Sequence, residues 1–360
     1  MVQFGVAMVM QNAHDQLPDK ESFERDLKIA QLIEPYGFDR ISAVEHHFSG
    51  YAMSPDNIVL LSWLAPQTKT LKLLTGAVIL PWWHNPVRIV ERMILLDHLS
   101  KGRALFGMGR GLAKREYVAF GIEMDTARER FNESAAMCLK GLETGFVEGN
   151  GTYYKQPRVE VRPRPYASFK DRSFCVAMSK DSVPVAAELG SRMMVFSQKP
   201  WEEMVDHFTT YRTLFQKFHG VAAPTPTVTE FMFCDENADR AAEMSAKYMG
   251  TYFDIIMDFY DFKGAHFETT KGYSGYAADA EKMRNTDHEV AKKNFVLHNN
   301  SGTPNQILEK YEKRRKLIGD FDMHVNVSYG GLSFKDAEQS MRTYATKVIP
   351  EVRSWSSQNS

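Results

Sequence analysis

Residues 75–111 read TGAVILPWWHNPVRIVERMILLDHLSKGRALFGMGRG, and this stretch decides the fold. The apolar run over residues 71–80 predicts a buried strand, and residues 86–99 have the period of an amphipathic helix. A Ser-Lys-Gly turn then leads into a second apolar strand at residues 104–108. The stretch is therefore a strand–helix–strand unit that ends on Arg110, at the carboxyl end of a strand, where α/β folds bind their ligands.

The same alternation continues along most of the chain. We predict eight strands, at Val2–Met10, Phe38–Val44, Leu71–Leu80, Ala104–Met108, Phe174–Ala177, Met193–Ser197, Thr227–Phe233 and Met323–Ser328. Helical patterns lie between and after them, near Lys20–Tyr36, Asn57–Pro66, Pro86–Leu99, Ala127–Phe146, Ser182–Leu189, Trp201–Phe218, Ala238–Tyr260, Pro304–Ile318 and Phe334–Val352. Eight strand–helix pairs predict an α/β fold, a (β/α)₈ TIM barrel. The alternative, a doubly wound sheet, would usually place Gly-x-Gly-x-x-Gly after the first strand, where this chain has Met-Gln-Asn-Ala-His.

Two segments depart from the repeat. Residues 148–171 are polar, aromatic and proline-rich, and we predict a small extra hairpin there. Residues 261–300 form a long insertion after the seventh strand, rich in Gly, Lys and Asp and without a clear period. A structureless insertion of that length is usually a mobile lid or a disordered loop. Because no repeat or low-complexity tract divides the chain, we expect a single domain over residues 1–360.

Composition narrows the class of protein. The chain has 360 residues, 43% of them hydrophobic, and a formal net charge of −1. This argues against nucleic acid or a membrane surface as the main partner, since both call for a basic surface. The three cysteines, Cys138, Cys175 and Cys234, lie far apart and form no Cys-x-x-Cys motif, so we expect neither a disulfide framework nor a zinc site. No signal peptide or membrane-spanning run is evident, and we expect a cytoplasmic protein.

The end of the second predicted strand carries the sequence Glu-His-His-Phe at residues 45–48. Side chains alternate along a strand, so at most one of the two histidines points inward. We expect His46 in a pocket at the barrel rim. A metal site that uses Glu45 and His46 is a weaker alternative, because the other strand ends lack further ligands.

Anion-binding groups follow two neighbouring strands. Arg110 stands between two glycines, which let the backbone approach a ligand, and a guanidinium suits a phosphate or carboxylate. The alternative is a structural Arg110 paired with a carboxylate such as Glu116. After the fifth strand, Ser179 and Ser182 surround the start of a helix, where free N–H groups attract anions. Trp82 and Trp83 follow the third strand and either line an apolar pocket or pack a loop against the barrel.

Several of these motifs resemble the luciferase-like flavin monooxygenase family, in its alkanal monooxygenase (bacterial luciferase) α-chain type. The resemblance rests on Gly-Phe-Asp (37–39) before Glu-His-His-Phe, Asn-Pro-Val-Arg (85–88), Leu-Leu-Asp-His-Leu-Ser-Lys-Gly-Arg (95–103) and Phe-Gly-Met-Gly-Arg-Gly (106–111). It extends to Val-Ala-Met-Ser (176–179), Lys-Gly-Tyr (271–273) and Gly-Thr-Pro (302–304), and so covers nearly the whole chain.

The resemblance implies a barrel that binds reduced FMN at its carboxyl rim. The matching peptide in relatives is a non-proline cis bond beneath the flavin ring, here Gly76–Ala77. His46 matches a histidine implicated in proton transfer, and residues 261–300 match a mobile loop that closes over the flavin. The implied cofactor-binding residues are Gly76, Ala77, Arg110, Met178, Ser179 and Ser182. Trp82, Trp83 and His84 are the expected substrate pocket, with His84 a second, weaker proton donor.

The implied reaction inserts one oxygen atom of O₂ into an apolar aldehyde, ketone or terpenoid-like substrate through a flavin hydroperoxide. A separate NAD(P)H-dependent flavin reductase would supply FMNH₂, since the chain has no dinucleotide-binding motif. The family resemblance also implies a homodimer or heterodimer. Gly109 and Met178 stand where the light-emitting chain has cysteine and glutamate, which favours a general monooxygenase. Alternatives are a deazaflavin-dependent dehydrogenase and a non-catalytic flavin-binding partner subunit. A metal-dependent hydrolase is a weaker alternative than these two.

Overall fold

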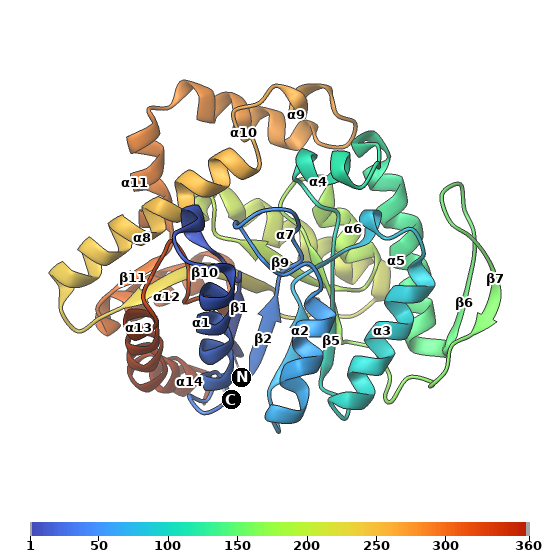
Figure 1. Cartoon of the computed structure of the whole chain (residues 1–360), viewed down its shortest axis with the longest axis horizontal. Coiled ribbons are helices and arrows are strands. Elements are labelled where there is room, and N and C mark those ends of the chain that lie inside the picture. Colours follow the sequence, from blue (N-terminus) through green and yellow to red (C-terminus); the bar gives the residue numbers. More distant parts are fainter. Residues whose placement is uncertain (1, 358–360) are drawn as a thin grey trace.

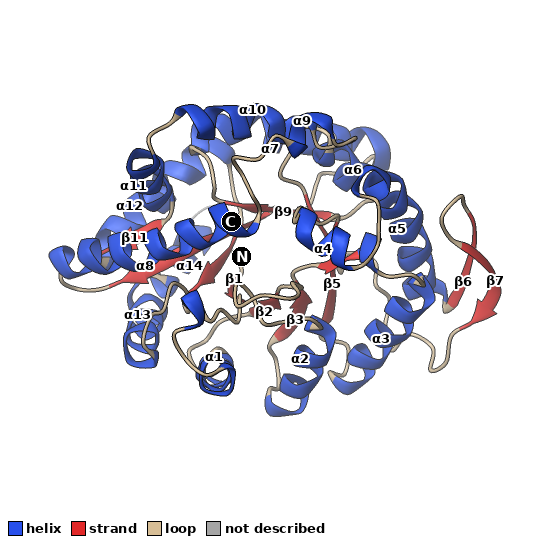
Figure 2. Cartoon of the chain, turned by 45° about the horizontal axis from the view of Figure 1, so that its top comes forward, coloured by secondary structure: helices blue, strands red, loops and turns tan. Residues whose placement is uncertain are grey.

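The computed structural model describes residues 2–357 and shows a closed barrel of eight parallel strands (Figures 1 and 2). The barrel strands, in spatial order, are β1 (Phe4–Met8), β2 (Arg40–Ala43), β3 (Lys72–Thr75), β5 (Ala104–Gly109), β8 (Ser173–Val176), β9 (Arg192–Phe196), β10 (Thr227–Cys234) and β12 (Asp322–Asn326). Pairing of β12 with β1 closes the ring, with Val325 opposite Val6. The prediction of a TIM barrel is confirmed.

Helices surround this barrel on its outer face (Figure 2). They are α1 (Asp19–Leu32), α2 (Asn57–Leu64), α3 (Pro86–Leu99), α5 (Ala127–Thr144), α6 (Ser182–Glu188), α7 (Trp201–His219), α8 (Ala238–Phe259), α12 (Pro304–Ile318), α13 (Phe334–Lys347) and α14 (Ile349–Ser357). The short helix α4 (Lys114–Ala119) lies instead over the end of the barrel that the insertion covers (Figures 1 and 2). Within residues 2–357, no helix combines the length and the apolar character needed to span a bilayer.

The third predicted strand is interrupted in its middle. It divides into β3 and the short β4 (Val78–Ile79), and the peptide bond between Gly76 and Ala77 is cis. The side-chain amide of Asn57 donates to the carbonyls of Ala43 and Ala77, at 3.1 and 3.0 Å, and so ties this break to the neighbouring strand. A Cβ on Gly76 would lie 2.9 Å from the Cβ of Ser42, a distance that leaves room for glycine alone.

The insertion, defined here as residues 261–300, is not structureless, and that expectation is wrong. It contains α9 (His266–Thr269), α10 (Ser274–Asn285) and α11 (His288–His298), and it leads into a short strand, β11 (Asn300–Gly302), that pairs with β10. Figure 1 shows the insertion as an arch over one end of the barrel. Its helices are covered with polar residues and bury few apolar side chains, so the helical period is weak in the sequence. Its mobility stays a prediction.

The predicted extra hairpin is present but lies further toward the N-terminus. It is formed by β6 (Phe146–Asn150) and β7 (Lys155–Glu160), which pair antiparallel and project from the side of the barrel. The remaining residues up to 171 form turns. The hairpin lies beside α5 and far from the carboxyl ends of the barrel strands, so it contributes nothing to the site described next.

Candidate active site

A cavity opens at the carboxyl ends of the barrel strands, and we call it the rim cavity. Six of the residues predicted to act at the site line it: His46, Gly76, Ala77, Arg110, Met178 and Ser182. These residues come from loops after four strands that are distant in the sequence. Their convergence on one cavity follows from the barrel, because the carboxyl ends of all its parallel strands meet at the same rim.

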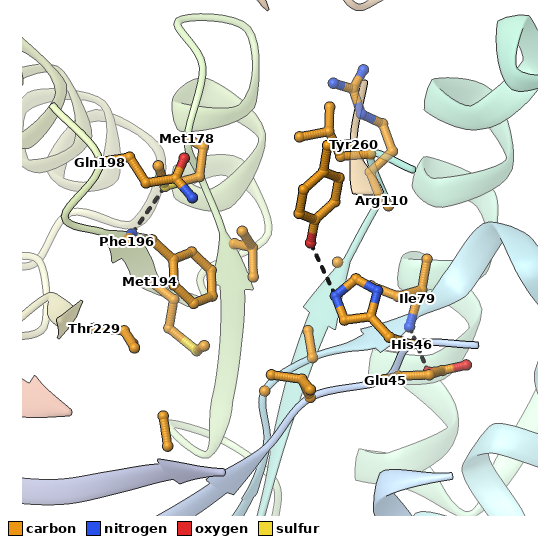
Figure 3. A pocket seen from close by; sticks show the side chains of 18 of the residues that line it. Glu45, His46, Ile79, Arg110, Met178, Met194, Phe196, Gln198, Thr229 and Tyr260 are labelled. Carbon is orange, nitrogen blue, oxygen red and sulfur yellow. Dashed lines mark hydrogen bonds between the residues drawn. The ribbon is translucent and has the colours of Figure 1, made fainter. Parts of the chain in front are cut away.

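His46 is held at both of its ring nitrogens. Its Nδ1 lies 3.2 Å from a carboxylate oxygen of Glu116, which is fully buried on α4. Its Nε2 lies 3.0 Å from the hydroxyl of Tyr260, directly after α8 (Figure 3). Glu116 also accepts the backbone N–H of His47 at 2.6 Å. The imidazole is thus fixed between a buried carboxylate and a phenol, with its ring in the rim cavity.

The hydrogen bonds continue from His46 into a cluster of tyrosines. The Tyr260 hydroxyl lies 3.3 Å from that of Tyr51, which lies 2.9 Å from that of Tyr252. Burial raises the pKa of all three phenols, so they are neutral at ordinary pH. The ring of Phe259 also packs edge-on against His46, at 5.4 Å between centroids. Aromatic side chains therefore surround the imidazole, and its polar contacts are the Glu116 carboxylate and the Tyr260 hydroxyl.

Arg110 is not paired with Glu116. Its guanidinium stacks over the ring of Tyr273, 3.8 Å from the centroid, and donates a hydrogen bond to the carbonyl of Gly272. The Tyr273 hydroxyl donates to the carbonyl of Gly111 at 2.9 Å. The Lys-Gly-Tyr segment of the insertion therefore lies directly against the predicted anion-binding arginine.

Arg128, at the start of α5, is a second cation in the lining of the rim cavity, and the sequence analysis missed it. Its Nη2 is buried and has no hydrogen-bond partner among the described residues. Burial, with the nearby charge of Arg110, lowers the pKa of its guanidinium, but an arginine remains protonated. A buried guanidinium N–H without an acceptor fits an anionic ligand. No local motif marks Arg128, because only the packing of α5 brings it to the rim.

The two predicted serines are close together, but only one of them lines the cavity. The backbone N–H of Ser179 donates to Oγ of Ser182 at 2.9 Å, and this hydroxyl donates to the carbonyl of Ser179 at 2.8 Å. Ser182 lies at the start of α6 and lines the rim cavity, together with Arg110 and Arg128. Ser179 is buried behind it.

The predicted substrate pocket of Trp82, Trp83 and His84 is placed elsewhere by the structure, and none of the three lines the rim cavity. Trp82 is buried against Tyr117 and Phe120, and His84 is exposed. The Trp83 indole donates to the buried Glu45 at 3.1 Å. Trp82 and Trp83 thus pack the loop after β4 against neighbouring residues, and His84 faces solvent.

The side of the rim cavity opposite His46 is apolar. It includes Met194 and Phe196 of β9 and Met178 after β8 (Figure 3). The thioether of Met178 accepts the backbone N–H of Phe196 at 3.0 Å. Gln198 lies next to them, and its side-chain amide has no hydrogen-bond partner in the described part of the chain. Within residues 2–357, no group of three His, Cys, Asp or Glu side chains is arranged to hold a metal ion.

The model of the luciferase-like monooxygenase family matches residues 2–320. The alkanal monooxygenase alpha chain of the Kryptophanaron alfredi symbiont is 28% identical over 298 residues, which cover 82% of this chain and 80% of that protein. The oxygenase component of the flavin-dependent trigonelline monooxygenase of Acinetobacter baylyi is 23% identical, covering 97% of this chain and 95% of that protein. The chain belongs to the luciferase-like monooxygenase family, and it is an enzyme of the flavin-dependent monooxygenase class.

Solved structures agree with the fold. The monooxygenase RslO1 from Streptomyces bottropensis superimposes with a TM-score of 0.81 at 24% identity, covering 97% of this chain and 99% of that one. The oxygenating constituent of 3,6-diketocamphane monooxygenase from Pseudomonas putida, in complex with FMN, gives 0.75 at 17% identity, covering 97% and 99%. An F420-dependent secondary alcohol dehydrogenase gives 0.70 at 14% identity, covering 97% and 98%. The same barrel therefore occurs with two kinds of flavin cofactor.

Proposed function

We propose that the rim cavity binds reduced FMN and that the enzyme uses it, with O₂, to oxygenate an apolar organic substrate. The observation that carries this proposal is the pair of guanidinium groups, Arg110 and Arg128, in one cavity, with the buried Nη2 of Arg128 lacking an acceptor. A phosphate supplies acceptors for both groups. Ser182 lines the same cavity at the start of α6.

Reduced FMN supplies two electrons to O₂, so that one oxygen atom enters the substrate and the other leaves as water. The chain shows no dinucleotide-binding motif, and one relative is named as the oxygenase component of its system. We infer that a separate NAD(P)H-dependent reductase delivers the reduced cofactor. The chain itself then has to bind the cofactor, exclude water and control protons.

His46 is the residue that we assign to proton control. Its Nε2 already contacts a neutral phenol, and Glu116 at Nδ1 stabilises the imidazole when it carries a proton. An imidazole held in this way is oriented to pass a proton to or from a bound ligand. The surrounding aromatic rings of Tyr51 and Phe259 limit the access of water.

Rapid mixing tests the proposal. Protein in excess is mixed anaerobically with photoreduced FMN and then with aerated buffer, and the return of oxidised-flavin absorbance is followed. We expect oxidised flavin to return much more slowly than for free reduced FMN, because the site shields the bound cofactor from water and protons. Reoxidation at the free-flavin rate, with protein in excess, would contradict the proposal.

The second candidate is a deazaflavin-dependent dehydrogenase, because F420-dependent enzymes share the barrel. Anaerobic titration with FMN and with F420 separates the two. Tight binding of F420 with no binding of FMN would favour the dehydrogenase. The paired His46 and Glu116 speak against a non-catalytic partner subunit, because such a subunit has no need of an oriented imidazole.

We also propose that the chain forms a homodimer through α2 and α3. Val59 and Trp63 on α2, with Leu95 and Leu99 on the neighbouring α3, are exposed at 58%, 39%, 51% and 50%. Each pair is spaced by four residues, so each forms a stripe on one side of its helix. Sedimentation of the wild type should show a dimer, and Leu95→Asp should shift it toward the monomer. A monomeric wild type would refute this part.

A further inference from the structure

A second cavity, which we call the side cavity, lies next to the rim cavity and beneath the insertion. Its walls are formed by α8, the loop between β9 and α7, and the insertion helices α10 and α11. Four residues line both cavities: Met178, Gln198, Phe262 and Tyr276. The two cavities therefore meet at a shared border on the side opposite His46, where Figure 3 shows Met178 and Gln198.

The inner wall of the side cavity is apolar. Phe253, Ile256 and Met257 of α8 line it and are buried, each at most 9% exposed. From α11, Ala291 and Phe295 face them across the cavity and are also buried. An apolar ligand gains free energy by leaving water for such a wall, and a polar body gains nothing there.

All four charged side chains in the lining are paired with one another. Lys199 contacts Asp279 at 2.6 Å, and Lys282 contacts Glu203 at 3.2 Å. Both ion pairs join α10 to the barrel side of the cavity. Burial lowers the pKa of His298, the one histidine among the lining residues, which favours its neutral form. The side cavity thus offers no unpaired charge to a ligand.

The shared border carries polar groups that lack partners. Gln198 is exposed and Tyr276 is half-buried, and neither the amide nor the hydroxyl is bonded to a protein group among residues 2–357, so both are free to meet a ligand. Burial raises the pKa of Tyr276 to about 12, so its hydroxyl is neutral and can donate. One donor from each residue suits a single carbonyl or hydroxyl oxygen placed at the border.

We propose that the side cavity holds the apolar body of an uncharged substrate, whose carbonyl or hydroxyl end lies at the border between Gln198 and Tyr276. The end to be oxygenated then reaches the rim cavity, while the rest stays beneath the insertion. This inference rests on the proposed function, since it places the substrate beside the cofactor of that proposal. What it adds is the place of each part of that substrate and its lack of charge, from the apolar wall and the paired charges of the side cavity.

Calorimetry with oxidised FMN present tests the assignment directly. The neutral probe is 2-undecanone, and the charged probe of equal length is undecanoate. We expect the ketone to bind about tenfold or more tightly than the carboxylate, because the side cavity has no group to neutralise a buried charge. Equal affinity of the two probes, or tighter binding of undecanoate, would overturn the uncharged class.

Variants of the side cavity test whether 2-undecanone binds there. Met283→Trp places bulk in the side cavity at a half-buried position and should weaken 2-undecanone binding about tenfold, since it displaces the hydrocarbon tail. Ala291→Leu is a second, smaller change in the same cavity and should act in the same direction. The matched control is Val290→Trp, at an exposed position of α11 next to Ala291. It should leave the binding of 2-undecanone unchanged.

FMN binding and reoxidation in air are measured on the same variants, and we expect both to match the wild type. If the cavity variants and the control bind 2-undecanone equally well, the side cavity is not the substrate site, whatever the flavin result. If reduced FMN is reoxidised at the free rate in every variant while the probe results hold, the proposed function fails and the cavity remains a ligand site.

Discussion

The two sides of the rim cavity differ in how their polar groups are used. On one side, which we call the relay wall, His46, Glu116, Tyr260 and Tyr51 are joined by hydrogen bonds. On the other, which we call the apolar wall, Met178, Met194 and Phe196 present sulfur and hydrocarbon, and the neighbouring Gln198 amide is unpartnered. The polar groups of the relay wall bond to one another, whereas the exposed Gln198 amide beside the apolar wall bonds to no protein group among the described residues.

This difference separates two tasks. A proton donor must be held in one orientation before the reaction begins, so its hydrogen bonds are supplied by the protein. A substrate must enter and leave, so the groups that meet it stay open. Variants of the relay wall should therefore change how much O₂ is released as H₂O₂ instead of entering the product. Variants of the apolar wall should change the KM for the substrate.

The largest effect is expected for His46→Ala, on the relay wall. Removal of a general acid–base group typically costs about 10²- to 10⁴-fold. We expect product formation to fall by about 100-fold or more and released H₂O₂ to rise, with FMN affinity kept. The measurement is the ratio of H₂O₂ to NADH consumed in a coupled assay with a flavin reductase. An unchanged ratio would show that His46 has no part in oxygen transfer.

Arg110→Ala tests whether the anion site belongs to the cofactor. Hydrogen bonds to charged groups contribute about 1.5–3 kcal/mol, so FMN affinity should fall about 10- to 150-fold. Riboflavin, which has no phosphate, should bind the variant and the wild type equally well in a fluorescence titration. Equal losses for both ligands would mean that Arg110 acts by holding Gly272 and Tyr273 in place.

Glu116→Gln should have a smaller effect, because Gln keeps an oxygen to accept the N–H of His47 but removes the charge beside His46. We expect about a tenfold loss of coupling. The measurement is again the ratio of H₂O₂ released to NADH consumed, because the loss of the Glu116 charge weakens the contact that orients His46. An unchanged ratio would show that Glu116 has no part in oxygen transfer.

The smallest change is expected on the apolar wall. Phe196→Leu should raise the KM for an apolar ketone by about two- to fivefold, since it removes part of a contact surface. The rate at which air reoxidises bound reduced FMN should not change, because this side chain makes no hydrogen bond to the His46 network. A faster reoxidation would mean that the two walls are not separate in function.

The barrel could be predicted from the sequence because its strands are short, continuous apolar runs between amphipathic helices. For the same reason His46, Arg110 and Ser182 were predicted to meet, since each follows a strand and the fold joins all strand ends. Glu116 and Arg128 were not assigned to the site. They lie on helices α4 and α5, and no local sequence pattern indicates which side of each helix faces the cavity. Tyr260 contacts His46 across 214 positions of sequence.

The errors have physical causes as well. Trp82 follows a strand end, but a 3₁₀ turn directs it into a satellite core with Tyr117 and Phe120. The insertion was expected to lack structure because its helices bury little, yet Asp287 caps α11 by accepting the N–H groups of Glu289 and Val290. That cap, with Ala291 and Phe295 four residues apart, was a usable signal for a helix.

The contact between Arg110 and the carbonyl of Gly272 has a consequence for how the enzyme exchanges its cofactor. The Arg110 guanidinium bonds to the insertion and, on our proposal, also to the cofactor phosphate. Binding of the cofactor and the position of the insertion are therefore thermodynamically linked. If the insertion is mobile, as we predict, a cofactor that arrives and departs with every turnover carries its own signal for closing and reopening the roof above it.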